Sequence, residues 1–239
     1  MGGLKVAVLI SGRGSNLQAL LDACADPAFP ARIVLVISNV ANAAGLQRAA
    51  AAGVPTAVVD HRAFAGRGAF EAALTDALAA AGADLVCCAG FMRVLTPGFV
   101  ARWHDRLVNI HPSLLPAFPG LDTHARALAA GVRFAGCTVH YVRAEVDAGP
   151  IIVQAVVPVL PGDDEAALAA RVLAAEHRCY PLALRLIAEG RATVEDGRVR
   201  ITGTAWADGV ATNPAATAGG VPKADELGYT LRPPGPEPA

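Results

Sequence analysis

The sequence predicts an α/β protein with a doubly wound, mostly parallel sheet, helices on both faces and an antiparallel addition of strands towards the C-terminus. Three observations predict this class. Apolar, β-branched runs alternate with alanine-rich helical stretches, which is typical of βαβ units. The apolar runs are continuous, so helices are expected to cover both faces of the sheet. After residue 111 the pattern changes to strands joined by a short polar turn, which favours antiparallel pairing.

The first half of the chain contains five predicted strands with helices between them. The strands are expected at residues 5–10, 33–38, 56–59, 85–89 and 107–111. The helices are expected at residues 16–24, 43–52, 67–81 and 97–103. This alternation indicates parallel strands connected by helical crossovers.

The second half begins with a proline-rich loop and continues with mixed elements. Pro112, Pro116, Pro119 and Gly120 predict a stiff loop before a short helix at 123–130. Strands at 134–142 and 151–159 flank the turn 143–149. A long helix is expected to begin after Asp163 or Asp164 and to reach about residue 189. The Asp-Gly pair at 196–197 predicts a hairpin of strands 192–195 and 198–202.

The composition of the chain changes near residue 205, which divides it into a predicted domain and a tail. Residues 1–203 are expected to form one domain, because 239 residues suffice for one large domain or two small ones. Residues 204–239 are rich in Gly, Ala and Pro, with six of the 17 prolines of the chain. Because this tail has no apolar periodicity, we expect it to be poorly ordered.

Composition also excludes several classes of function. Lys+Arg 20 against Asp+Glu 21 leaves a net charge of -1, which argues against a nucleic-acid partner. No apolar run reaches the roughly 18–20 residues that a bilayer span needs, and no signal-like segment opens the chain, so we expect a cytoplasmic protein without a membrane partner. The five cysteines are scattered without a CxxC pair, which predicts reduced thiols. No metal-ligand spacing is present, so no metal is expected.

A glycine loop, residues 11–16, joins the first strand to the first helix. A helix N-terminus has free N–H groups and a positive dipole end, and glycine allows close backbone approach to a phosphate. The loop lacks the lysine of a P-loop and the third small residue of a dinucleotide motif, since Leu17 stands there. It therefore fits a monophosphate, with Ser15 and Asn16 as side-chain donors, one of which could also cap the helix. The alternative is an ordinary tight turn.

A second polar cluster follows the fifth strand. Asn109 and His111 are two residues apart and share one face of an extended segment. Asp147, in the later turn before Gly149 and Pro150, could orient a histidine and stabilise its charged form. An amide, an imidazole and a carboxylate suit acyl transfer through an oxyanion. The alternatives are a structural histidine and a turn-forming aspartate. In a doubly wound sheet, both polar clusters lie at the carboxyl ends of the strands.

Four stretches, VLISGRGSNLQ (8–18), AGFMR (89–93), NIHPSLLP (109–116) and DAGPII (147–152), are characteristic in combination. In this order they resemble the phosphoribosylglycinamide formyltransferases of the folate-dependent formyltransferase family, from Val6 to about Gly203. The third stretch is shared by all folate-dependent formyltransferases, whereas the SGxGSN pattern distinguishes this branch. The resemblance implies formyl transfer from 10-formyltetrahydrofolate, as co-substrate, to the amine of glycinamide ribonucleotide (GAR) in purine biosynthesis.

The resemblance also assigns roles to individual residues. It makes Asn109, His111 and Asp147 the catalytic trio. It places substrate binding at Gly14, Ser15, Asn16, Leu173, Ala174, Ala175 and Glu176. It places folate binding at Arg67, Met92, Arg93, Val94, Leu95, Asn109, Arg143, Ala144, Glu145, Val146 and Asp147. Without the resemblance, Glu176 would be taken for a solvated helix residue.

The resemblance implies small-molecule substrates and a monomer or homodimer. One departure from the family is Asp122, which stands where relatives have histidine and changes the charge of the loop before the short helix.

Three rival functions stay open on sequence grounds. They are a formyltetrahydrofolate hydrolase, which needs the trio but no phosphate loop, a methionyl-tRNA formyltransferase, which needs a further RNA-binding domain, and a catalytically silent nucleotide-binding module.

Overall fold

The computed structural model describes residues 3–203. The predicted tail, 204–239, lies outside the described residues. A seven-stranded sheet has the order β3-β2-β1-β4-β5-β6-β7. Its strands are β1 Leu4–Ile10, β2 Ala31–Ser38, β3 Thr56–Val58, β4 Leu85–Cys88, β5 Leu107–His111, β6 Phe134–Tyr141 and β7 Ile151–Pro158. The pairings from β3 to β5 are parallel, and β6 and β7 join antiparallel. The predicted fold class is confirmed.

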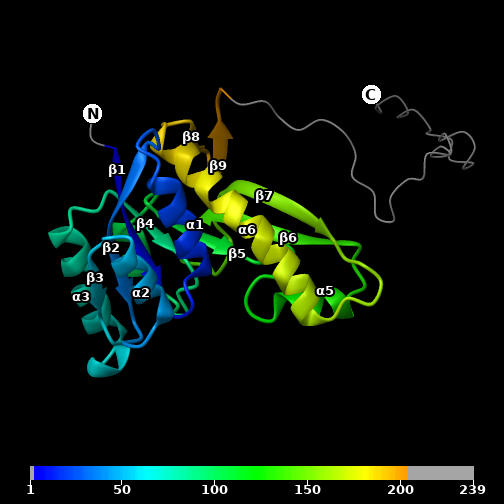
Figure 1. The fold of residues 1–239 in the computed structure, drawn as a ribbon, viewed down its shortest axis with the longest axis horizontal. Helices are drawn as coiled ribbons and strands as arrows, with labels where there is room; N and C mark the ends of the chain where they lie inside the picture. Colours follow the sequence, from blue (N-terminus) through cyan, green and yellow to red (C-terminus); the bar gives the residue numbers. More distant parts are fainter. Residues whose placement is uncertain (1–2, 204–239) are drawn as a thin grey trace, which may run out of the picture. The chain divides into compact units, whose positions relative to one another are not determined.

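Helices cover both faces of this sheet, as the continuous apolar runs indicate. Successive residues of β1 point to opposite faces, so Val6 and Val8 join one buried cluster whereas Ala7 and Leu9 join the other. The first cluster lies under α1 (Ser15–Cys24), α2 (Ala44–Ala51), α5 (Thr123–Ala129) and α6 (Glu165–Ala188). The second lies under α3 (Arg67–Ala80) and α4 (Pro97–Arg102). Figure 1 shows α6 and α1 side by side, and the two helices are in contact.

Local signals in the sequence account for the ends of several elements. Of the two aspartates before α6, Asp164 caps the helix, because its side chain accepts a hydrogen bond from Ala167 N at 2.8 Å. Asp163 instead pairs with Arg171 at 2.7 Å. The predicted hairpin forms a separate two-stranded sheet, β8 (Ala192–Glu195) with β9 (Arg198–Ile201). Its turn has positive φ at Asp196 (48°) and Gly197 (74°), as a tight hairpin turn requires.

Two features of the described chain were not predicted. A short 3-10 helix, η1 (His61–Ala63), follows β3 and is capped by Asp60, whose side chain accepts from Arg62 N at 3.0 Å. The loops around the strand ends also contain non-glycine residues with positive φ, including Phe118 (54°) and Asp147 (55°). The five cysteines are free thiols, four of them buried, as expected.

Candidate active site

The glycine loop leads directly into the N-terminus of α1. Gly14 is the N-cap residue, with φ 71° and no capping side chain, so neither Ser15 nor Asn16 caps the helix. The first intrahelical hydrogen bond runs from Gln18 N to Gly14 O at 2.9 Å. The N–H groups of the first turn therefore point out of the helix at its positive end, which is an arrangement that binds anions.

The contacts of Gly14 explain why this position needs glycine. A Cβ on this residue would lie 2.7 Å from Gly45 Cα, and the positive φ already disfavours any side chain. Gly45, at the start of α2, donates from its N–H to Gly12 O at 3.0 Å. Glycine is needed here because the loop passes backbone-to-backbone against α2.

Asn16 and Glu176 bring α1 and α6 together beside this loop. Asn16 Nδ2 donates to Glu176 Oε2 at 2.6 Å, across 160 residues of sequence. Glu176 is buried, which corrects the solvated reading, and burial raises the pKa of its carboxyl although the Asn16 hydrogen bond opposes the shift. Asn16 Oδ1 is buried without a partner in the described structure. Ser15 is half-buried beside this pair.

The preceding turn of α6 carries the other three residues assigned to the substrate. Leu173 and Ala175 are half-buried and Ala174 is exposed. They lie within three residues of Glu176, as the assignment requires.

The predicted trio is brought together at the end of β5 (Figure 1 shows the position of this strand). His111 is buried, and its Nδ1 lies 3.4 Å from Asp147 Oδ2. Asn109 lies opposite His140 in the β5–β6 register, and Asn109 Nδ2 is 3.4 Å from His140 Nε2. Asp147 Oδ1 is 3.7 Å from His140 Nε2. The trio is thus a group of four polar side chains, with His140 as its fourth member.

The contacts of His140 indicate which of its ring nitrogens carries a proton. Its Nδ1 faces Tyr141 O at 3.0 Å, so Nδ1 carries the proton and donates. Burial lowers the pKa of His140, which keeps the ring neutral and leaves the lone pair of Nε2 to accept from Asn109. His140 therefore fixes which way the Asn109 amide points, and its position on the strand paired with β5 is the sequence signal for this role.

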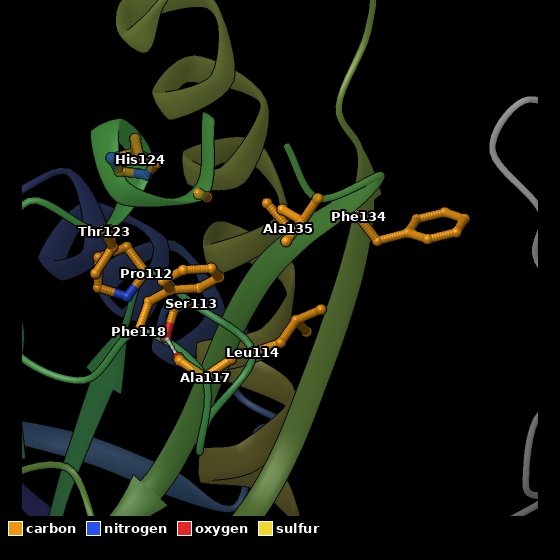
Figure 2. Close-up of a pocket in the computed structure, with 11 residues that line it drawn as sticks. Pro112, Ser113, Leu114, Ala117, Phe118, Thr123, His124, Phe134 and Ala135 are labelled. Carbon is orange, nitrogen blue, oxygen red and sulfur yellow. Dashed lines mark hydrogen bonds between the residues drawn. The ribbon is translucent and has the colours of Figure 1, made fainter. Parts of the chain in front are cut away.

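The loop after β5 covers His111. His111 Nε2 lies 3.0 Å from Phe118 O, and Gly120 N donates to Asp147 Oδ2 at 2.8 Å. Both ring nitrogens of His111 thus face oxygen acceptors. Beneath this loop is an apolar cavity of about 100 Å³, where Figure 2 shows Ser113, whose Oγ donates to Ala117 O at 2.6 Å, and His124 of α5. Asp122 is exposed at the start of α5.

The residues matched to folate binding lie on four separate segments, one of which is β5 with Asn109. Arg67 is exposed at the first position of α3, and Ala144, Glu145 and Val146 are exposed in the turn before Asp147. In the loop after β4, Met92, Arg93 and Val94 are exposed and Leu95 is half-buried. Arg143 is directed towards Asp105, with Nη2 2.5 Å from Oδ1, so its guanidinium is already paired.

Ser11 connects the glycine loop to the loop after β4, a contact that was not predicted from the sequence. Its Oγ donates to Asn39 Oδ1 at 2.5 Å and accepts from Met92 N at 2.8 Å. The phosphate-type loop and the loop after β4 therefore share one hydroxyl. The signal was present in the sequence, because Ser11 and Asn39 each directly follow a parallel strand.

Within residues 3–203, no group of three or more His, Cys, Asp or Glu side chains could hold a metal ion. Among the described helices, none is both long and apolar enough to cross a membrane.

Comparison with known proteins identifies the class. A family model described as formyl transferase matches residues 4–184. The chain therefore belongs to the formyl transferase family, which confirms the resemblance found in its motifs.

Within that family, one curated protein and one solved structure are each similar to this chain over most of its length. Phosphoribosylglycinamide formyltransferase of Escherichia coli (strain K12) is 45% identical over 206 residues, which cover 86% of this chain and 94% of that protein. Glycinamide ribonucleotide transformylase 1 from Symbiobacterium toebii has a crystal structure with a TM-score of 0.81 and 54% identity, covering 84% of this chain and 94% of that one.

A longer relative contains a region similar to this chain. The trifunctional purine biosynthetic protein adenosine-3 of Drosophila melanogaster is 55% identical over 192 residues. The match covers 80% of this chain but 14% of the length of that protein.

Proposed function

We propose that this protein transfers the formyl group of 10-formyltetrahydrofolate to the primary amine of GAR, giving formyl-GAR and tetrahydrofolate in de novo purine (IMP) biosynthesis. The observation that carries the proposal is the pairing of Asn16 with buried Glu176 beside the free N-terminus of α1. A helix N-terminus suits a phosphate, and a carboxylate suits an amine. The two together fit a substrate that has both groups.

The nucleotide would bind with its phosphate on the N–H groups of the first turn of α1. Gly14, Ser15 and Asn16 form this end of the site, and the hydroxyl of Ser15 adds a donor. The carboxylate of Glu176 and the unpartnered Oδ1 of Asn16 are acceptors for the N–H groups of the glycinamide. Residues 173–175 would line the path between them.

The folate would lie along the exposed residues at the start of α3, in the loop after β4 and in the turn before Asp147. Arg67 offers a cation for a carboxylate of the folate, and the apolar side chains of Met92, Val94 and Val146 offer a surface for its ring system. Arg93, Leu95 and residues 143–145 would complete this surface.

The transfer itself needs no covalent enzyme intermediate. The amine nitrogen attacks the formyl carbon, the new C–N bond forms, and the carbonyl oxygen becomes an oxyanion. The oxyanion then re-forms the carbonyl as the bond from this carbon to the folate nitrogen breaks, and the electron pair of that bond passes to the folate nitrogen. That nitrogen receives a proton, and the former amine loses one.

The trio supplies charge stabilisation and the proton path. Asn109 Nδ2 has one hydrogen for His140 and a second for the oxyanion. His111 Nε2–H, which faces Phe118 O in this structure, would donate to the oxyanion instead. Asp147 Oδ2, 3.4 Å from Nδ1, would hold the ring in the orientation in which Nε2–H reaches the oxyanion and then the departing folate nitrogen.

The proposal is tested by assaying tetrahydrofolate formation with and without GAR. We expect formation only with the nucleotide, and little with the dephosphorylated nucleoside. Production of tetrahydrofolate and free formate without the nucleotide would instead identify a hydrolase. A second test uses the variant Asn16→Ala, in which the loss of the hydrogen bonds of Asn16 should raise the KM for GAR by about tenfold. The same variant should leave the folate KM unchanged.

A further inference from the structure

The loop between β4 and α4 is held by a buried carboxylate that the proposed reaction does not use. Glu71 is 6% exposed and lies on α3, one helical turn after Arg67. Its Oε1 accepts from Thr96 N at 2.7 Å, and its Oε2 accepts from the hydroxyl of Thr96. Within residues 3–203, the salt bridges do not include Glu71, and both oxygens of this buried carboxyl contact one residue of the loop.

Stability is a weak reason for such a carboxylate. Apolar replacements of buried polar and ionic groups are often neutral or stabilising, so stability alone does not explain why a carboxyl is buried here. What Glu71 provides is geometry. Thr96 is the N-cap of α4, where its Oγ1 accepts from Phe99 N at 3.3 Å. Glu71 therefore fixes the end of the loop and the start of the next helix in one contact.

Two further anchors hold the same loop at its start. Phe91 stacks on Phe70, with ring centroids 6.5 Å apart and an interplanar angle of 11°. Met92 N donates to Ser11 Oγ at 2.8 Å. Phe70 and Glu71 are consecutive residues, so α3 supplies two of the three anchors and also carries Arg67 at its first position.

Between these anchors the loop exposes apolar side chains. Met92 is 65% exposed and Val94 is 61% exposed, although hydrogen bonds fix the backbone of the loop at Met92 and at Thr96. Exposed apolar side chains on a fixed backbone form a surface that is organised before its ligand arrives. On the proposed function, that ligand is the folate.

We infer that Glu71 is a positioning residue for the folate. Through Thr96 it sets loop 90–96 at a fixed place relative to Arg67, so that the cation and the apolar surface meet one ligand together. Glu71 itself touches no substrate. The inference rests on the proposed function only in that folate is the ligand of this loop.

The test compares Glu71→Met with Glu71→Gln by calorimetric titration with tetrahydrofolate. Methionine keeps the volume but removes both acceptors, and we expect binding to weaken about tenfold. Glutamine can accept from Thr96 N through its oxygen and donate to Thr96 Oγ1 through its nitrogen, so binding should stay within about threefold. The KM for GAR should change less than about twofold in both variants, because the nucleotide binds at α1 and α6.

Leu78→Ala is the matched control for destabilisation. Leu78 is fully buried in the same helix, and its apolar side chain cannot form a hydrogen bond with Thr96. Its truncation should therefore lower the Tm and leave folate binding unchanged. Should Glu71→Met not fold, Thr96→Val removes only the hydroxyl, and Thr96→Ser should restore binding. The inference is overturned if Glu71→Met keeps wild-type folate affinity, or if Glu71→Met and Leu78→Ala lose affinity in proportion to their loss of Tm.

Calorimetry separates this inference from the proposed function. Wild-type protein that binds tetrahydrofolate but transfers nothing to GAR would overturn the proposed function, and the Glu71 comparison would still give its answer. Wild-type protein that does not bind tetrahydrofolate would overturn both.

Discussion

The two halves of the candidate site are built from different parts of the chain. The half proposed for the nucleotide, here the nucleotide half, uses the backbone N–H groups of the first turn of α1, beside the close approach of Gly14 to Gly45, for its phosphate end. The half proposed for catalysis, here the catalytic half, consists of side chains, with His111, Asp147 and two neighbours at 2.8–3.7 Å from one another or from the loop after β5. A backbone site is changed by altering the path of the chain, whereas a side-chain site can be dismantled one group at a time.

The difference also extends to what surrounds each half. Helix α1 is fixed by its packing against α6, where Asn16 reaches Glu176. Asp147 and Phe118, by contrast, both have positive φ in loops, at 55° and 54°. Such backbone conformations are uncommon outside glycine and persist only where surrounding contacts enforce them. The catalytic half therefore depends on loop contacts that the nucleotide half does not share.

The largest expected effect comes from removing one group of the catalytic half. His111→Ala and Asp147→Asn should each lower kcat by roughly 10²–10⁴-fold, because a positioned acid–base group contributes that much. Binding of GAR, measured by calorimetry, should stay within about twofold of wild type. Wild-type turnover in either variant would remove that residue from the mechanism.

The next effect distinguishes backbone from side chain within the nucleotide half. Gly14→Ala places a Cβ 2.7 Å from Gly45 Cα at a positive φ, so it should lower the Tm by several degrees, on the order of 1–2 kcal/mol for the conformation alone. Ser15→Ala should keep the Tm and raise the KM for GAR about tenfold. Thermal melts and steady-state kinetics of both variants check this. A stable Gly14→Ala protein with normal GAR binding would contradict the backbone account.

The sequence predicts regular elements and chemical roles better than it predicts tertiary contacts. Continuous apolar runs indicated the parallel strands, and the Asp196-Gly197 pair indicated the hairpin, because both signals are local. The approach of Gly14 to Gly45 could not be predicted, since it depends on how two helices pack. Glu71 gave no signal either, because one acid in an alanine-rich helix is normally solvated and only the fold brings it to Thr96.

A smaller effect concerns the pH dependence of stability through Glu176. Its pKa is raised above the ordinary value of 4.5, so between 4.5 and the raised pKa the folded state holds a proton that the unfolded state has lost. Stability from this group therefore falls as pH rises through that window. Glu176→Gln keeps an acceptor for Asn16 without the charge, and its Tm should exceed that of wild type at pH 8.

The Tm advantage of Glu176→Gln should disappear below pH 4.5, where the wild-type carboxyl is protonated in both states. Asp76→Asn, an exposed change on α3, is the control and should not alter the shape of the Tm–pH curve relative to wild type. A constant difference between Glu176→Gln and wild type at all pH values would show that burial of the charge is not the cause. The same variant should bind GAR more weakly, because the amine loses its anionic partner.

The smallest expected effect comes from a change outside both halves. We propose that residues 1–203 contain the whole activity, because the matched motifs end before Gly203. A protein ending at Gly203 keeps the carbonyls of Thr202 and Gly203 that accept from Arg191, with Arg191 Nε 2.9 Å from Thr202 O. Its new terminal carboxylate would also lie beside that cation. We expect kcat/KM within about threefold of the full chain and a Tm within a few degrees.

A protein ending at Ile201 is the matched comparison, because it lacks both carbonyls, so its Tm should be the lower of the two. If the protein ending at Gly203 folds but does not turn over, residues 204–239 complete the site, and the division between a backbone half and a side-chain half would need a third part.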